Sequence, residues 1–111
     1  MSAEANIKKS TEQLEAIGVT VNATLIEKIV KRLGIANQSV DASHVAATDP
    51  SEVERLKKNF VIKKLEQEDN DATDAVIADI LEKMKPHRLK QRGAVYYLLV
   101  SHYGKESLYI K

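Results

Sequence analysis

Five basic or titratable side chains surround the predicted start of the last helix of the chain. They are Lys85, His87, Arg88, Lys90 and Arg92. Cations in the first turn of a helix oppose its macrodipole, so their clustering there needs a reason. An anion held at the helix N-terminus, where free N–H groups add to the attraction, supplies one. The cluster therefore predicts a candidate anion site for a phosphate, a nucleic-acid backbone or an acidic protein surface.

The same cluster also has a purely structural interpretation. Lys83 and Lys85 would end the preceding helix, where cations favour the macrodipole, and the other cations would pair with the acids of residues 66–79. The helix between these two segments is about 20 Å long at 1.5 Å per residue, which leaves only Asp79 and Glu82 well placed for such pairs. Both interpretations stay open at this point.

The acidic run at residues 66–79 raises the question of a calcium loop. An EF-hand loop has glycine at position six and glutamate at position twelve. A loop that starts at Asp69 has Asp74 and Ile80 at those positions, so the pattern fails. Acids before and within the first turn of a helix favour its macrodipole, which is a sufficient reason for the run.

No other motif of catalysis or metal binding stands out. The chain has no cysteine, which excludes thiol chemistry, disulfides and cysteine-ligated metals. His44, His87 and His102 lack the spacing of zinc ligands, and neither a GxSxG nucleophile motif nor a glycine-rich phosphate loop is present. The sequence therefore predicts no metal and no cofactor. It favours a protein that is not an enzyme, with an enzyme site assembled in space as an alternative.

Length, charge and hydropathy set wider bounds. The chain has 111 residues and a net charge of +1, which suits one domain and argues against a strongly basic nucleic-acid binder. Residues 1–10 lack the apolar region of a signal peptide, and no apolar run has the length of a membrane span. We therefore expect a cytoplasmic protein that makes no membrane contact, in keeping with the missing cysteine.

The elements that position these residues are predicted to be helices, because glycine and proline are scarce and strand-type alternation is hard to find. Residues 3–16 have a thin apolar face, so residues 1–18 are expected to hold a docked helix that frays. Asn22 is the predicted cap of a second helix, which would end at Gly34. Asp49 and Pro50 begin a third helix in a capping-box pattern.

The next two helices meet at Pro86. Asn70 or Asp71 is the expected cap of the first, which ends near Pro86 because the residue before proline is pushed out of the helical region. The last helix is predicted from about His87 to Tyr103, closed by Gly104.

Residues 95–100 are apolar or aromatic without a break, which indicates a buried, central helix. Its tyrosines are therefore interpreted as core residues with one polar end rather than as platforms for stacked bases. The predicted core consists of apolar side chains at helical spacing, namely Leu25, Ile29, Leu33, Leu56, Phe60, Ile77, Ile80, Leu81, Val95, Leu98 and Leu99.

Two stretches carry a resemblance to a known family. They are DPSEVERLKKNFVIKKL at residues 49–65 and GAVYYLLVSHYGKESLY at residues 93–109, with the acidic run between them. In order and spacing they resemble a family of small bacterial proteins, domain-of-unknown-function family 2853, from about Ile7 to the end of the chain. The resemblance implies a compact, soluble, mainly helical bacterial protein. It implies no activity, cofactor or catalytic residue.

We therefore expect a single all-α domain over residues 1–111, a compact bundle of four to five helices with the most buried helix near the C-terminus. Residues 105–111 form a C-terminal tail. Its Leu108, Tyr109 and Ile110 are expected to pack back onto the bundle or onto a second copy, and they form a candidate interface.

The predicted function is a small non-enzymatic interaction module that binds a protein partner or itself. Anion or nucleic-acid binding through the basic start of the last helix is the first alternative. An enzyme whose site is not visible in the sequence is the second.

Overall fold

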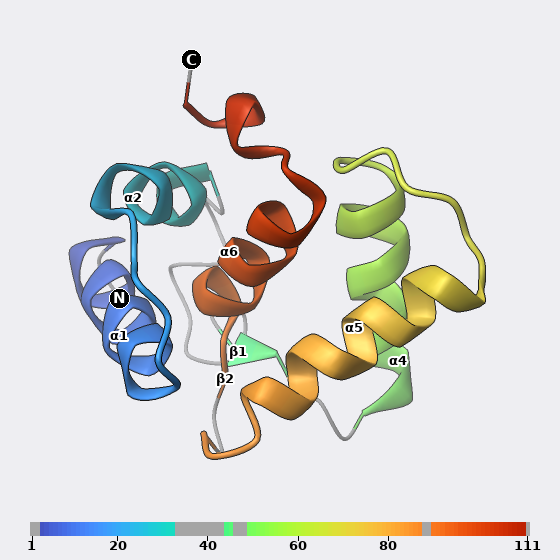
Figure 1. Ribbon diagram of the computed structural model, residues 1–111, viewed down its shortest axis with the longest axis horizontal. Coiled ribbons are helices and arrows are strands. Elements are labelled where there is room, and N and C mark those ends of the chain that lie inside the picture. The colour runs from blue at the N-terminus through green and yellow to red at the C-terminus, as the bar shows by residue number, and fades with distance from the viewer. Residues whose placement is uncertain (1–2, 33–43, 46–48, 88–89, 111) are drawn as a thin grey trace.

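The computed structural model describes residues 3–32, 44–45, 49–87 and 90–110 (Figure 1). The helical elements are α1 (Ala3–Ala16), α2 (Ala23–Arg32), α4 (Pro50–Leu56), the π-helix η2 (Lys57–Ile62), α5 (Asp71–Lys83), α6 (Arg92–Tyr103) and the 3₁₀ turn η3 (Glu106–Leu108). The strands β1 (His44–Val45) and β2 (Lys90–Gln91) form one short antiparallel pair with His44 opposite Gln91. The prediction of an all-α bundle is confirmed, with this small pair of strands as an addition.

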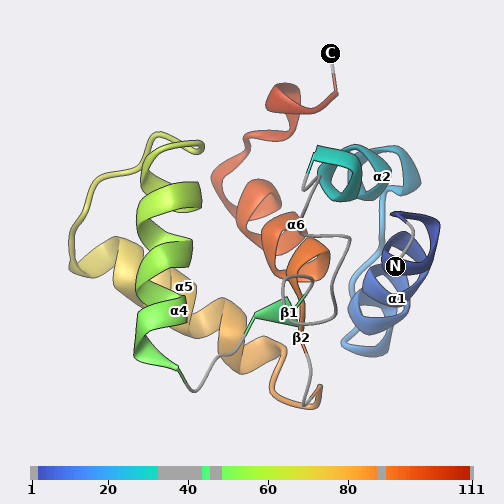
Figure 2. The same cartoon turned by 180° about the vertical axis from the view of Figure 1, so that it is seen from behind.

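Helix α6 runs through the middle of the bundle (Figures 1 and 2). Helices α1 and α2 lie on one side of it, and α4 and α5 lie on the other. The predicted position of the most buried helix is confirmed. The side chains of α6 that are buried are Ala94, Val95, Tyr97, Leu99 and Val100, and the backbone of Gly93 is buried with them.

Local capping signals correctly predicted where several helices begin and end. Asn22 Oδ1 accepts hydrogen bonds from the backbone N–H of Thr24 and Leu25 at 3.0 and 3.1 Å. Asp49 Oδ1 accepts from Ser51 at 2.9 Å, with Pro50 next to it as expected. Such caps satisfy backbone donors that have no partner inside the helix.

Two further helix ends also follow from local sequence. Of the two candidate caps for α5, Asn70 is the one used, because its Oδ1 accepts from Thr73 N–H at 3.0 Å. Gly104 ends α6 in the left-handed conformation at φ 66°, which glycine adopts without steric cost.

The predicted start of the last helix is wrong. Helix α6 begins at Arg92 and not near His87, because Lys90 and Gln91 are extended and pair with β1. The backbone N–H of Gln91 also donates to Gln13 Oε1 of α1 at 2.9 Å. These contacts come from distant parts of the chain, so a local helical pattern could not reveal them.

The core largely agrees with the predicted set. Of the predicted core residues, Leu81 and Leu98 are half-buried against the core. Those that are buried in it are Leu25, Ile29, Leu56, Phe60, Ile77, Ile80, Val95 and Leu99. Leu33 and the expected helix end at Gly34 lie outside the described residues. Tyr97 is a core tyrosine with a polar end, as predicted. Its hydroxyl accepts from Asn22 N–H at 2.8 Å and donates to Thr20 O at 3.3 Å.

Helix α1 has the predicted bounds, 3–16, and docks on the bundle through Leu14, which is completely buried. It approaches α6 closely at Gly93. A Cβ atom placed there would lie 2.8 Å from both Ser10 Oγ and Val30 Cγ2. Within the ranges described, no helix combines the length and the apolar character needed to cross a lipid bilayer.

Candidate functional site

Of the described members of the predicted basic cluster, Lys85 and Lys90 line one cavity, whereas Arg92 lines another. Arg92 turns inward to Glu52, with 2.6 Å between Nη2 and Oε1, and both side chains are about five-sixths buried. Lys90 is 8% exposed, and its Nζ donates to the carbonyl of His87 at 2.9 Å. Two of the five cations therefore already have partners inside the protein.

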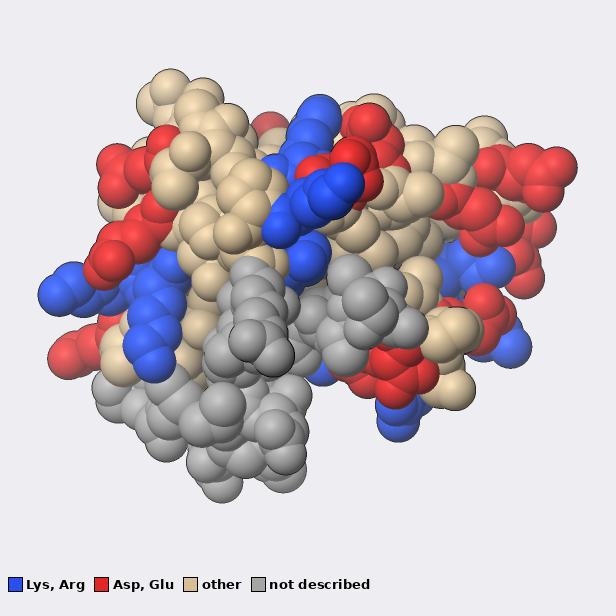
Figure 3. Space-filling view, turned by 90° about the horizontal axis from the view of Figure 1, so that it is seen from below, with Lys and Arg blue, Asp and Glu red and all other residues tan. Residues whose placement is uncertain are grey.

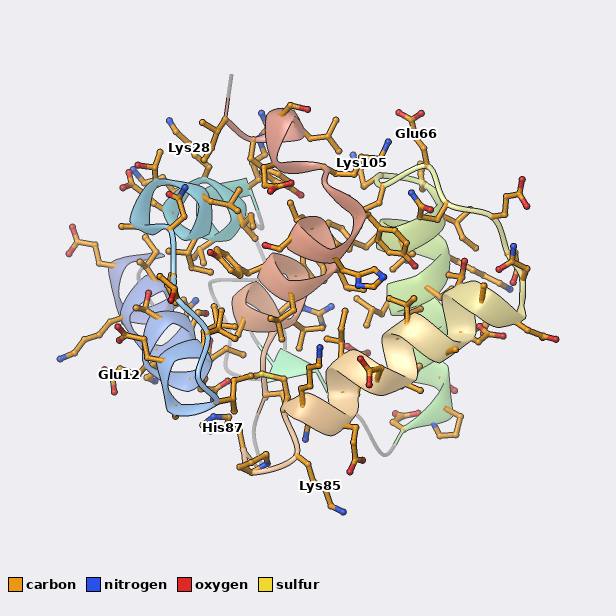
Figure 4. The ribbon with its side chains drawn as sticks, in the orientation of Figure 1. Glu12, Lys28, Glu66, Lys85, His87 and Lys105 are labelled. Carbon is orange, nitrogen blue, oxygen red and sulfur yellow. The ribbon has the colours of Figure 1, made fainter. Side chains whose placement is uncertain are left out.

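The other two described members, Lys85 and His87, point in different directions (Figure 4). Lys85 projects from the end of α5 and lies 3.8 Å from Glu82, while Nε2 of His87 lies 3.0 Å from the carbonyl of Gln13 in α1. Arg88 lies outside the described residues. These contacts favour the structural interpretation for the four residues that are described, and the anion site at this position stays a prediction.

The pairing differs from the structural interpretation made from the sequence. That interpretation paired Asp79 and Glu82 with the cations after Pro86, whereas Asp79 lies 3.5 Å from Lys83 and Glu82 lies 3.8 Å from Lys85. Arg92 pairs with Glu52 of α4 and not with the acids of residues 66–79.

A different group of cations shares one cavity that the sequence did not predict. This cavity of about 410 Å³ lies between α2, the end of η2, α6 and the C-terminal segment, and we call it the basic–aromatic pocket. Its described lining residues are Ile29, Arg32, Asn59, Phe60, Lys64, Arg92, Tyr96 and Tyr109. Arg92 is the one member of the predicted basic cluster that takes part.

The charge of the basic–aromatic pocket is positive. Arg32 and Lys64 are exposed at its rim, and the described part of the chain provides no ion pair for either. Arg92 lies deeper and is neutralised by Glu52, which is not among the lining residues. The described lining residues include no aspartate or glutamate, so an anion entering the pocket meets attraction from both sides of the rim.

Aromatic rings form much of the inner wall. Phe60 and Tyr96 stack with 3.7 Å between ring centroids and 12° between their planes. The guanidinium of Arg92 lies 5.9 Å from the Tyr96 centroid, and that of Arg32 lies 5.0 Å from the Tyr109 centroid. A guanidinium over the face of a ring is held by a cation–π attraction, which fixes the position of the charge.

Two pocket residues, Tyr109 and Arg92, have pKa values that their surroundings raise. Burial raises the pKa of Tyr109, although nearby Arg32 acts in the opposite direction, so its hydroxyl keeps its proton at neutral pH. Burial disfavours the charged form of Arg92, but hydrogen bonds and charge interactions with Tyr96 and Glu52 outweigh it and raise its pKa. The pocket therefore presents fixed cations and phenol donors, a combination suited to holding an anion.

A second cavity of about 630 Å³ lies between α4, η2 and α5, and its charges are already paired. Lys57 of η2 is 9% exposed, and its Nζ lies 3.0 Å from both Asp69 and Asp74 and 3.5 Å from Glu54. Hydrogen bonds to Asp74 and Asp69 are the main reason that the pKa of Lys57 is raised. We call this group the Lys57 cluster.

The described residues contain no group of three or more histidines, aspartates or glutamates placed to hold a metal ion. The acidic run was expected to serve the start of α5, and Asp71 and Asp74 do lie in the first turn of that helix. The structure adds the pairing of Asp69 and Asp74 with Lys57, which no pattern in the sequence predicted.

The three residues of the candidate interface at the C-terminus differ in their exposure. Tyr109 and Ile110 are half-buried and pack on the core, so this part of the tail turns back onto the bundle beside α2 (Figure 1). Leu108 is 37% exposed and is the one large hydrophobic side chain exposed among the described residues. An interface with a second copy stays a prediction.

Comparison with known families shows which family the chain belongs to. A model of the family described as Protein of unknown function (DUF2853) matches residues 8–107. The chain belongs to this family. The resemblance seen in the sequence is thereby confirmed, and the matched region includes every described lining residue of the basic–aromatic pocket except Tyr109. A search of curated proteins gives no match to this DUF2853 chain.

Proposed function

We propose that this protein is a non-enzymatic interaction module that binds an acidic segment of a partner protein in the basic–aromatic pocket. The observation that carries the proposal is the placement of Arg32 and Lys64 at the rim of one cavity whose described lining contains no acid. The described lining side chains supply cations, an amide, phenols and apolar rings. These groups bind and orient a ligand.

An acidic protein segment fits the charge distribution better than a nucleic acid does. The net charge is only +1, and positive and negative side chains are interspersed on the face seen in Figure 3. Nucleic-acid backbones are bound along extended rows of cations, with affinity that grows with each phosphate contacted. Two rim cations and one partly neutralised cation suit one or two carboxylates instead.

The expected affinity is modest and depends on salt. Exposed ion pairs each contribute roughly 0.2–1 kcal/mol, and partial burial within the pocket raises that contribution. Burial of apolar parts of the ligand against Ile29 and Phe60 adds to it. Binding should weaken as the salt concentration rises from about 50 to 200 mM, because exposed charges are screened.

The test is a titration of isotope-labelled protein with an oligoglutamate peptide, followed by the shifts of backbone amide resonances. We expect shifts at the end of α2, at residues 59–64 and at Tyr109, and weaker binding at the higher salt concentration. An oligolysine peptide of the same length should leave these resonances unchanged. Absence of binding by the acidic peptide, or equal binding of both peptides, would contradict the proposal.

A pair of double variants localises the binding. Arg32→Ala with Lys64→Ala removes both rim cations and should abolish the shifts. Lys31→Ala with Lys63→Ala removes the same charge from neighbouring exposed positions that do not line the pocket, and should bind as the wild type does. Equal losses in both variants would show that only the overall charge matters.

We place this binding in the cytoplasm of a bacterium, as the family resemblance and the cysteine-free sequence lead us to expect. Self-association is a special case, in which the acidic run of a second copy is the bound segment. Light scattering on the titrated sample distinguishes it, because a mass above that of the monomer in the absence of peptide would assign the pocket to a second copy.

A further inference from the structure

We infer that the basic–aromatic pocket selects a partner segment in which an aromatic side chain is flanked by acidic ones. This inference rests on the proposed function and specifies the partner's chemistry. It is drawn from the size of the cavity, the nature of its walls and the separation between its exposed and buried parts.

The cavity is larger than a carboxylate requires. Its volume of about 410 Å³ lies within the range of roughly 300–1,000 Å³ that is typical of pockets for whole small molecules. A carboxylate held between Arg32 and Lys64 would occupy only the rim, since both residues are exposed. The interior is left for a side chain of the same partner segment.

The inner wall combines apolar and aromatic side chains with polar ones. Ile29 and Phe60 are 1% and 4% exposed, and Tyr96 and Tyr109 are half-buried around them. A flat ring that enters such a space makes offset or edge-to-face contacts that are worth about 0.5–1.5 kcal/mol beyond the burial of its area. An aliphatic side chain gains the burial but not these contacts.

The cations strengthen the preference for a ring. The Arg32 guanidinium already lies over the Tyr109 ring, 5.0 Å from the centroid, and a second ring beside it would gain the same kind of attraction. The carboxylates on either side of that ring would then lie at the rim, near Arg32 and Lys64. Aromatic contact inside and ion pairing outside are therefore compatible in one bound segment.

The experiment compares pentapeptides, each with four charged residues around one central residue, in titrations at low salt. Acidic peptides with phenylalanine, leucine or alanine at the centre test the interior, and a peptide of four lysines around phenylalanine tests the rim. We expect the phenylalanine peptide to bind roughly three- to tenfold more tightly than the leucine peptide, as the aromatic contact energy implies. The lysine peptide should not bind.

The outcomes separate the two proposals. Equal affinity for the acidic phenylalanine and leucine peptides would overturn this inference and leave the proposed function standing. Failure of every acidic peptide would overturn the proposed function. Binding of the lysine peptide, or tighter binding of a short single-stranded oligonucleotide than of any acidic peptide, would also overturn the proposed function.

Variants of the C-terminal segment locate the source of selectivity. Tyr109→Ala removes one wall of the interior and should bring the affinities for the phenylalanine and leucine peptides to the same value. Leu108→Ala is the matched control, because this neighbouring side chain is exposed and does not line the pocket. A full preference retained in Tyr109→Ala would overturn the inference.

Discussion

The Lys57 cluster and the basic–aromatic pocket use the same kinds of side chain in opposite ways. Lys57 is nearly buried and contacts three carboxylates, whereas Lys64, further along the same segment, is exposed at a cavity whose described lining has no acid. In the cluster, the one cation is held by carboxylates of the same chain, which contributes to stability. In the pocket, the two rim cations have no ion pair within the described residues, and we propose that they contribute to binding instead.

The largest expected effect comes from Lys57→Met. Without the ammonium group, Asp69 and Asp74 lose the cation that lies 3.0 Å from each of them, and their like charges repel each other. We expect the greatest fall in Tm of all the substitutions discussed, greater than that of Arg92→Met. Acidic-peptide affinity should remain unchanged. A thermal scan and a titration on the same variant measure both quantities, and a variant that binds poorly while remaining stable would erase the distinction between the two regions.

The pH dependence of the difference in Tm between wild type and Lys57→Met tests whether the Lys57 ammonium group is the source of the stability. The pKa of Lys57 is raised in the folded protein, so its stabilising effect is fully present below the unfolded pKa of about 10.4 and is lost as pH rises through the folded value. The difference in Tm between wild type and Lys57→Met should therefore be constant from about pH 7 to 9 and shrink only above about pH 10.4. A difference that already disappears near pH 8 would contradict this role for Lys57.

Arg92→Met should lower stability less than Lys57→Met does, and it should clearly weaken the binding of acidic peptides. It removes the partner that lies 2.6 Å from Glu52, which is 17% exposed and keeps Arg55 at 3.2 Å. Hydrogen bonds to charged groups contribute about 1.5–3 kcal/mol, and we expect a loss of unfolding free energy in that range. Denaturant unfolding measures the loss. Glu52→Gln is the matched comparison, because the amide oxygen can still accept from Arg92, and it should lose less. The opposite order would show that the ion pair is not the source.

The smallest effect on stability is expected at the pocket rim. Arg32→Ala with Lys64→Ala should lower the unfolding free energy by about 0.5–1 kcal/mol at Arg32, which loses its cation–π contact with Tyr109, and by no more than about 0.5 kcal/mol at Lys64. Both side chains are exposed and make no ion pair within the described residues. Their cations are nevertheless expected to carry acidic-peptide binding. Denaturant unfolding of this variant checks the first expectation, and a large loss of stability would mean that these cations serve the fold.

Local sequence predicted much of the fold for identifiable reasons. Asn22, Asp49 and Asn70 cap helices through hydrogen bonds to residues two or three positions away, so their neighbours in the sequence reveal them. Gly104 ends α6 by its own backbone freedom. The apolar run of α6 predicted its burial because a helix that is apolar on most sides has no face suited to water.

The features that escaped prediction all depend on contacts between distant residues. The late start of α6 follows from the pairing of β2 with β1, and from Gln13 of α1. Lys57 is buried because the chain folds back to bring Asp69 and Asp74 against it. No spacing in the sequence signals either arrangement.

The pocket is the clearest case of this limit. Arg32, Lys64 and Tyr109 come from three separate segments of the chain and share one cavity only after folding. Of the basic cluster that the sequence predicted near the last helix, only Arg92 is among the described lining residues of the pocket. Of the three tail residues predicted as a candidate interface, Tyr109 lines the pocket.

The central claim is that the rim cations of the basic–aromatic pocket bind acidic segments. The most direct measurement is one titration of the acidic phenylalanine peptide into the wild type, the Arg32→Ala and Lys64→Ala double variant, and the Lys31→Ala and Lys63→Ala double variant. The account predicts equal affinity for the first and third proteins and at least a tenfold loss for the second, which corresponds to about 1.4 kcal/mol. Equal affinity for all three proteins would contradict it.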